Sequence, residues 1–108
     1  MSKSNWKQRE RNASKYFGGD GRTPLSGMNS KHTHADVLHD FLFIECKQRV
    51  KHTAVTLWDK TKALAKKEKK IPVVCLSEKG RPGFWVLVHS DDLTAVANQR
   101  TLAAREGQ

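Results

Sequence analysis

The alternation of hydrophobic and polar residues along this chain predicts helices at both ends and in the middle, with short strands between them. A first helix is expected over residues 6–17, where Trp6, Ala13, Tyr16 and Phe17 supply a partial apolar face. Lysines and arginines occupy the positions between them. The glycine-rich run that follows is typical of a helix stop, so the pattern predicts that the helix ends there.

Two hydrophobic runs in the first half predict a pair of strands. They cover residues 36–38 and 41–47, and the chain can turn between them at His39 and Asp40. The runs are almost continuously hydrophobic, which favours strands that are covered on both faces. Residues 22–27 contain a proline and read as an edge strand or a loop.

The second half predicts a helix, two strands and a last helix. The helix is expected over residues 54–69, the strands over 71–76 and 84–89, and either Ser90 or Asp91 can cap the helix that continues to about residue 104. Six residues of the 54–69 helix share one stripe, at three- and four-residue spacing: Ala54, Leu57, Trp58, Thr61, Leu64 and Ala65.

This order of elements predicts an α/β sandwich in which helices flank one central mixed sheet. With 108 residues the chain has room for one small domain, so residues 1–108 are expected to form a single domain. The ends, residues 1–4 and 105–108, are expected to be frayed.

Charge and cysteine content narrow the class of protein. Lys and Arg number 20 against 11 Asp and Glu, a net charge of +9, which favours a polyanionic partner and nucleic acid first. The alternative is a protein with a basic surface and no such partner. Cys46 and Cys75 lie in hydrophobic runs, so buried thiols are expected rather than a disulfide, which suits a reducing cytoplasm. No apolar run approaches the roughly 20 residues of a membrane span.

Three residues around the first strand pair carry the candidate chemistry. Side chains alternate along a strand, so Glu45 and Lys47 are expected to point the same way, and the turn brings Asp36 back beside Glu45. Two carboxylates and an ammonium would then converge, which is typical of a site for a divalent cation and a polarised water. In the alternative, Asp36 caps a turn while Glu45 and Lys47 form a surface pair.

A second pattern overlaps the first. His32, His34 and Asp36 read as His-x-His-x-Asp, which is similar to the zinc motif of the metallo-β-lactamase fold. That motif continues with histidine, whereas the next residue here is Val37. The two histidines are therefore expected to be exposed loop residues near DNA.

The acidic constellation resembles the PD-(D/E)XK nuclease superfamily. Asp36 matches the first acid, Glu45 the second and Lys47 the lysine, while Ala35 stands where the family often has proline. The chain is most similar to the archaeal-type Holliday junction resolvases. Those proteins carry a glutamate in the first helix, here Glu10, an arginine-serine-glycine stretch before the first acid, and a Glu-Cys-Lys-x-Arg ending.

The resemblance implies a Mg²⁺-dependent DNA endonuclease in which Mn²⁺ can substitute. Asp36, Glu45 and the backbone carbonyl of Cys46 would hold the metal, with Glu10 as an outer ligand or supporting acid, and Lys47 would orient the attacking water. The expected DNA contacts come from polar and basic residues along the chain: Arg22, Ser26, Lys31, Gln48, Arg49, Lys62, Lys66 and Lys69.

The substrate and the assembly follow from the same resemblance. Junction resolution would need a homodimer carrying two sites. A sequence-specific homing or restriction enzyme, a nicking enzyme and a catalytically silent DNA-binding protein remain open as alternatives.

Overall fold

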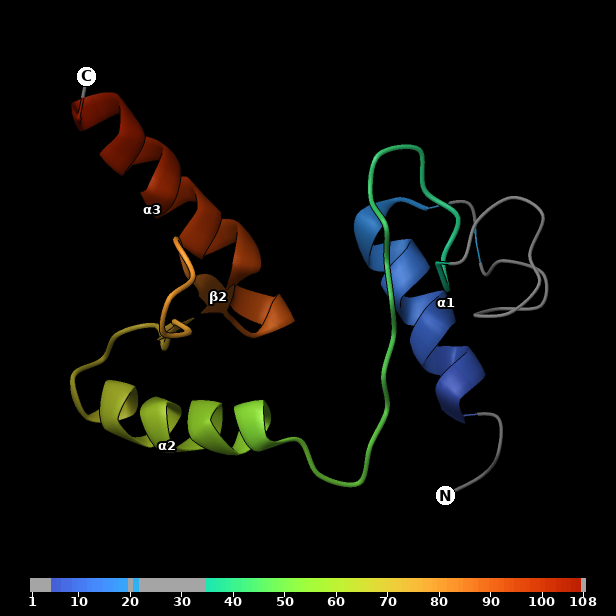
Figure 1. Ribbon diagram of the computed structural model, residues 1–108, viewed down its shortest axis with the longest axis horizontal. Coiled ribbons are helices and arrows are strands. Elements are labelled where there is room, and N and C mark those ends of the chain that lie inside the picture. The colour runs from blue at the N-terminus through green and yellow to red at the C-terminus, as the bar shows by residue number, and fades with distance from the viewer. Residues whose placement is uncertain (1–4, 20, 22–34, 108) are drawn as a thin grey trace. The chain divides into compact units, whose positions relative to one another are not determined.

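The computed structural model describes residues 5–19, 21 and 35–107 (Figure 1). Contacts divide the chain into a first unit, residues 1–50, and a second unit, residues 51–108, and each is described by itself. The single-domain organisation stays a prediction. The described elements are α1 (Asn5–Phe17) in the first unit and, in the second unit, α2 (Thr53–Lys67), β1 (Val74–Leu76), β2 (Trp85–Leu87), η1 (Ser90–Asp92) and α3 (Leu93–Glu106).

Helix α1 confirms the predicted first helix but buries a different face. Trp6, Tyr16 and Phe17 are exposed, whereas Glu10 and Ser14 are buried. These two polar residues lie four positions apart, so they stand one above the other on the same side of the helix. The partial apolar face predicted for this helix is therefore not the face that the structure buries.

The end of α1 is held close to the segment that follows residue 35. Gly18 adopts φ +68°, a conformation that favours glycine and ends the helix as predicted. The Ser14 hydroxyl accepts a hydrogen bond from the Gly21 amide at 2.8 Å, and the Gly21 carbonyl accepts one from the Leu38 amide at 2.9 Å. A Cβ atom on Gly19 would lie 2.6 Å from the Leu38 carbonyl oxygen, so this close approach requires glycine.

The predicted strand pair over residues 36–47 is reduced to one isolated antiparallel bridge, between Val37 and Ile44. Both bridge residues are buried, but Phe41 is 91% exposed and Phe43 is 69% exposed. The expectation of strands covered on both faces is therefore wrong. Hydrophobic runs become ladders only where further strands and a covering layer exist, and within the described residues these two runs pair at one bridge and leave Phe41 and Phe43 uncovered.

His39 holds the turn between the two bridge residues, as predicted for a turn residue. Its Nδ1 atom accepts hydrogen bonds from the amides of Phe41 and Leu42, both at 3.1 Å. Its Nε2 atom lies 2.8 Å from the carbonyl oxygen of Phe17. When Nδ1 is an acceptor, Nε2 carries the proton, so the ring joins the turn to the end of α1.

The second unit combines α2 with a short hairpin. Helix α2 confirms the predicted helix with bounds shifted by one or two residues, yet none of its residues is fully buried. Trp58, Thr61 and Ala65 are its half-buried positions from the predicted stripe, whereas Leu57 and Leu64 are exposed. In the hairpin Val74 pairs with Leu87, Cys75 with Val86 and Leu76 with Trp85, antiparallel.

The predicted central mixed sheet is wrong. Among the described residues the sheet has two strands, and the Val37–Ile44 bridge belongs to the other unit. Both predicted strands of the second half are shorter than expected. Pro72 has no amide hydrogen for a ladder, and the second strand is followed within three residues by η1. The Val86 face of the hairpin is exposed rather than covered by a helix.

The last helix, α3, confirms the prediction, but its start differs. The side chain that caps η1 is His89, whose Nδ1 accepts a hydrogen bond from the Asp91 amide at 3.1 Å. Ser90 and Asp91, the predicted caps, lie inside η1.

Both cysteines are free thiols, as expected. Cys46 is half-buried, whereas Cys75 is exposed, so the expectation of a buried thiol is wrong for Cys75. The position of Cys75 on the uncovered face of the hairpin explains its exposure, because Val86, its cross-strand partner, is exposed as well.

Candidate functional site

Asp36 is tied to the segment that carries the second acid. Its amide donates a hydrogen bond to the Ile44 carbonyl at 2.9 Å, and its Oδ2 atom accepts one from the Cys46 amide at 2.6 Å. The side chain is buried, with 6% of its surface exposed. A hydrogen bond to a carboxylate is stronger than one between neutral groups, so this bond fixes Asp36 beside residues 44–46.

Glu10 is the second buried acid of the first unit. It has 4% of its surface exposed, although it lies between two exposed arginines, Arg9 and Arg11. Burying a charged group is costly unless other groups compensate for the lost water. Sequence reasoning placed Glu10 at this site only through a family resemblance, and the inward orientation of α1 gives it a second, physical basis.

Glu45 and Lys47 form an ion pair, with Lys47 Nζ 3.1 Å from Glu45 Oε2. The predicted same-side orientation of these two residues is therefore confirmed. Both side chains are substantially exposed, so the pair contributes little to stability. The two residues do not lie in a buried strand, so the alternative of a surface pair stays open. Evidence for a metal site must come from the residues around the pair.

Asp36, Glu10 and Glu45 all act electrostatically on the Cys46 thiol. Burial raises the pKa of the Cys46 thiol above its ordinary value. Three negative carboxylates raise this pKa further, in the order Asp36, Glu10 and Glu45. Because charge–charge interactions weaken with distance, each of the three acids lies close enough to Cys46 to affect its thiol. The thiol itself is kept protonated, which argues against a nucleophilic cysteine.

The donor set fits a hard divalent cation. Mg²⁺ prefers oxygen ligands and is commonly held by one or two carboxylates together with water. Within residues 5–19, 21 and 35–107, no three His, Cys, Asp or Glu side chains are grouped so that they could hold a metal ion. The full ligand set, with Glu45 and the Cys46 carbonyl, stays a prediction.

The predicted DNA contacts divide between the two units. Gln48 and Arg49 are exposed and directly follow the Glu45–Lys47 pair. The predicted contacts Lys62, Lys66 and Lys69 belong to the second unit, on α2 or just after it, and are exposed. Three predicted contacts and both histidines of the rival zinc pattern lie outside the described residues: Arg22, Ser26, Lys31, His32 and His34.

Sequence reasoning missed two residues that position this site. Ser14 binds the Gly21 amide from one turn beyond Glu10, and Gly19 allows the close approach to Leu38. The signal for Ser14 was its spacing of four residues from Glu10. The signal for Gly19 was a second glycine directly after the one that ends the helix, where a single glycine would serve as the stop.

No family model, curated protein or solved structure matches the chain. The resemblance described above therefore depends on the residues alone. Among the helices of the described segments, none combines the length and the apolar character that crossing a membrane requires.

Proposed function

We propose that this chain is a Mg²⁺-dependent endonuclease that hydrolyses phosphodiester bonds in DNA. The proposal depends on the acids and the lysine of the first unit, in the order that resembles PD-(D/E)XK nucleases, and not on the arrangement of a sheet. The net charge of +9 supports a polyanionic substrate. The free thiols suit a reducing compartment, the cytoplasm.

One observation carries the proposal. The buried carboxylate of Asp36 accepts a hydrogen bond from the amide of Cys46, the residue between Glu45 and Lys47. This bond joins the first acid to the centre of the acid-x-lysine segment, although the two are ten residues apart in sequence. A surface ion pair and an unrelated turn cap would not need to be connected in this way.

The chemistry follows from the types of side chain. Asp36, Glu45, the Cys46 carbonyl and Glu10 are the groups that would hold Mg²⁺ or Mn²⁺. The bound cation would supply Lewis-acid chemistry at the scissile phosphate and a water of lowered pKa. The Lys47 ammonium would orient that water and stabilise the negative charge that develops on the phosphate. Arg49 and Gln48 would contact a flanking phosphate.

The proposed substrate is branched DNA, and the proposed assembly is a homodimer. One small chain presents one set of acids, whereas cutting two strands of a junction symmetrically needs two sets related by a two-fold axis. A homing, restriction or nicking enzyme is the alternative within the same chemistry. A catalytically silent DNA-binding protein is favoured by one observation, the lack of a three-ligand group among the described residues.

The test is cleavage of labelled four-way junction, linear duplex and single-stranded DNA, each with Mg²⁺, with Mn²⁺ and with EDTA. Asp36→Asn and Glu45→Gln remove one negative charge while keeping the size of the side chain. Glu106→Gln removes the same charge from an exposed residue of α3 and serves as the control. In the Asp36→Asn variant the side-chain amide oxygen can still accept the hydrogen bond from the Cys46 amide, so folding is expected to persist.

We expect cleavage that EDTA stops, and a loss of about a hundredfold or more in both acid variants, because Lewis-acid stabilisation is worth several kcal/mol. DNA binding should remain, and light scattering should give the mass of a dimer. DNA binding without cleavage of any of the three substrates would exclude the nuclease and support the catalytically silent DNA-binding protein. Wild-type cleavage by Asp36→Asn would overturn the site.

A further inference from the structure

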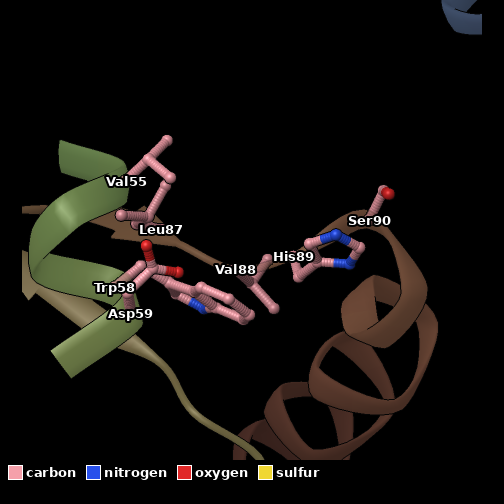
Figure 2. A pocket seen from close by; sticks show the side chains of 7 residues that line it. All are labelled: Val55, Trp58, Asp59, Leu87, Val88, His89 and Ser90. Atoms are coloured by element: carbon pink, nitrogen blue, oxygen red, sulfur yellow. The ribbon is translucent and has the colours of Figure 1, made fainter. Parts of the chain in front are cut away.

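A pocket of about 390 Å³ opens in the second unit, between α2 and the segment that leaves β2 (Figure 2). In this view Val55 and Leu87 lie at one end, His89 and Ser90 lie at the other, and Trp58 lies between them. The volume is at the lower end of the range for small-molecule sites. Its size therefore suits one small planar group rather than a large ligand.

Two aromatic rings line this pocket. The ring centroids of Trp58 and His89 lie 5.4 Å apart, with their planes inclined by 31°. Val55 and Leu87 complete an apolar lining around the indole. The two rings are close enough to interact with each other, so a flat π system such as a nucleobase would stack on the indole by replacing His89.

Polar groups at the pocket match the edge of a base. Asp59 and Ser90 are among the residues that line the pocket, so a carboxylate-bearing and a hydroxyl-bearing side chain lie at its border. The Trp58 Nε1–H group is buried, and it has no hydrogen-bond acceptor in the described part of the chain. Buried donors are nearly always paired, so this one favours an occupant that brings an acceptor once the covering side chains shift.

Positive charge lies directly beside the indole. Lys62 Nζ is 5.3 Å from the centroid of the Trp58 ring, one helical turn along α2. Lys66 follows after one more turn, a rise of about 6 Å. The second unit contains eleven Lys and Arg against six Asp and Glu. A largely apolar pocket beside a row of lysines is complementary to a strand that carries both bases and phosphates.

We propose that this pocket takes one unpaired base of a DNA strand while Lys62 and Lys66 contact its neighbouring phosphates. The inference rests on the DNA binding proposed above and extends it, because it names unpaired bases as the feature that the second unit recognises. The paired bases of a duplex are stacked inside the helix and cannot enter without being flipped out. The second unit would therefore direct the protein to junctions, ends and single-stranded regions.

The experiment measures binding of a short fluorescein-labelled single strand in EDTA, so that no cleavage occurs. A strand with the same backbone but abasic sites is the companion probe. Val55→Phe fills the pocket from an exposed position of α2, and Leu57→Phe makes the same change at an exposed position of α2 outside the pocket. Trp58→Leu removes the indole, with Trp85→Leu as its control, and circular dichroism checks that each variant folds.

We expect the intact strand to bind more tightly than the abasic strand. Val55→Phe and Trp58→Leu should each weaken binding of the intact strand by about fivefold to a hundredfold, the range for loss of one base–aromatic stack. Neither should change binding of the abasic strand, and both controls should bind as the wild type does. Equal binding of the intact and abasic strands, or equal losses from Val55→Phe and Leu57→Phe, would overturn the base pocket while leaving DNA binding in place. Binding of neither strand would overturn both proposals.

Discussion

The two units of this chain place their charged residues in opposite ways. In the first unit two acids, Glu10 and Asp36, are buried together with the hydroxyl of Ser14. In the described part of the second unit every lysine and arginine is exposed, and the one buried side chain is Val74. The first unit holds negative charge away from water, and the second presents positive charge to it.

This difference separates a site that would act on a ligand from a surface that would hold one. A buried charge costs several kcal/mol unless other groups compensate for it, and Asp36 accepts a hydrogen bond from the Cys46 amide. Exposed lysines keep their contact with water, so they cost little free energy of folding. Together with aromatic side chains they can bind the phosphates and bases of a nucleic-acid strand. Under the proposed function, catalysis would belong to the first unit and affinity to the second, and each part can be tested separately.

The sharpest test compares two ion pairs of the same spacing. Lys47 pairs with Glu45 at 3.1 Å in the first unit, and Lys70 pairs with Glu68 at 3.3 Å in the second. Lys47→Ala should lower the cleavage rate by about a hundredfold, because it removes a charge that stabilises the transition state. Lys70→Ala should leave the rate unchanged.

Melting curves measured beside these rates distinguish a catalytic lysine from a structural one. An exposed ion pair is worth only about 0–1 kcal/mol, so both variants should melt close to the wild type. If Lys47→Ala melts much earlier but keeps its turnover per folded molecule, the lysine is structural and the division between the units fails.

The second test concerns affinity. Replacing Lys62, Lys66 and Lys69 with glutamine should weaken duplex binding for all sequences alike. Each lost phosphate contact lowers the slope of log affinity against log salt by about 0.9, so three lost contacts lower it by about 2.7. Anisotropy titrations over a range of salt concentrations give this slope.

The control removes the same charge from the first unit, through glutamine at Lys7, Arg9 and Lys15, all exposed on α1. We expect its slope to stay close to that of the wild type. Equal slopes for the two triple variants would mean that binding follows total charge rather than the lysines of the second unit.

The third test compares two glycines. Gly19→Ala would bring a Cβ atom within 2.6 Å of the Leu38 carbonyl, so α1 and the turn must separate. We expect a loss of about 1–3 kcal/mol in the free energy of unfolding, the usual range for overpacking. Gly80→Ala meets no atom within 4 Å but adopts φ +82°, so it should cost about 1 kcal/mol through backbone strain alone.

Urea unfolding measures both costs. Only Gly19→Ala should also impair cleavage, because it disturbs the contacts between α1 and the residues that directly follow Asp36, Val37 and Leu38. Cleavage at the wild-type rate by a destabilised Gly19→Ala variant would show that α1 has no part in the site.

The smallest expected effect is a difference in thiol reactivity. The thiolate is the reactive form, and burial and nearby acids raise the pKa of the Cys46 thiol. Cys46 therefore stays protonated at pH values where an ordinary thiol begins to ionise, and it should react with iodoacetamide severalfold more slowly than the exposed Cys75. The stability that this shift contributes is present below the ordinary thiol pKa and is lost as the pH rises through the raised one.

Peptide mapping after timed alkylation reads both sites in one sample. Asp36→Asn should speed alkylation of Cys46 and leave Cys75 unchanged, because Asp36 is the carboxylate with the largest effect on the thiol. An unchanged rate at Cys46 would mean that the acids do not converge on it.

Local pattern was sufficient for the helices and for the direction of the Glu45–Lys47 pair. Helical periodicity is a property of a continuous segment, so α1, α2 and α3 could be read from the chain within a few residues. The orientation of Glu45 and Lys47 depends only on their spacing of two. The turn at His39 was predictable as well, because it depends on two neighbouring polar residues between hydrophobic runs.

Pattern was insufficient wherever a distant partner decides the outcome. The run at Phe41 and Phe43 has the composition of a buried strand, but strands form only against a partner, and the described part of the chain supplies a single bridge. The inward face of α1 depends on the Ser14–Gly21 hydrogen bond rather than on hydrophobicity. The pocket was not predicted because Trp58 lies on α2 whereas His89 lies between β2 and η1, thirty-one residues later in the sequence.

The two-stranded sheet has a consequence for how the protein behaves in solution. In the described part of the chain β1 pairs with β2 alone, so each strand has an outer edge whose amides and carbonyls can pair with another molecule. Mutual repulsion at a net charge of +9 keeps free molecules apart. DNA would cancel that repulsion, so turbidity should peak where protein and phosphate charges balance and should disappear when either component is in excess.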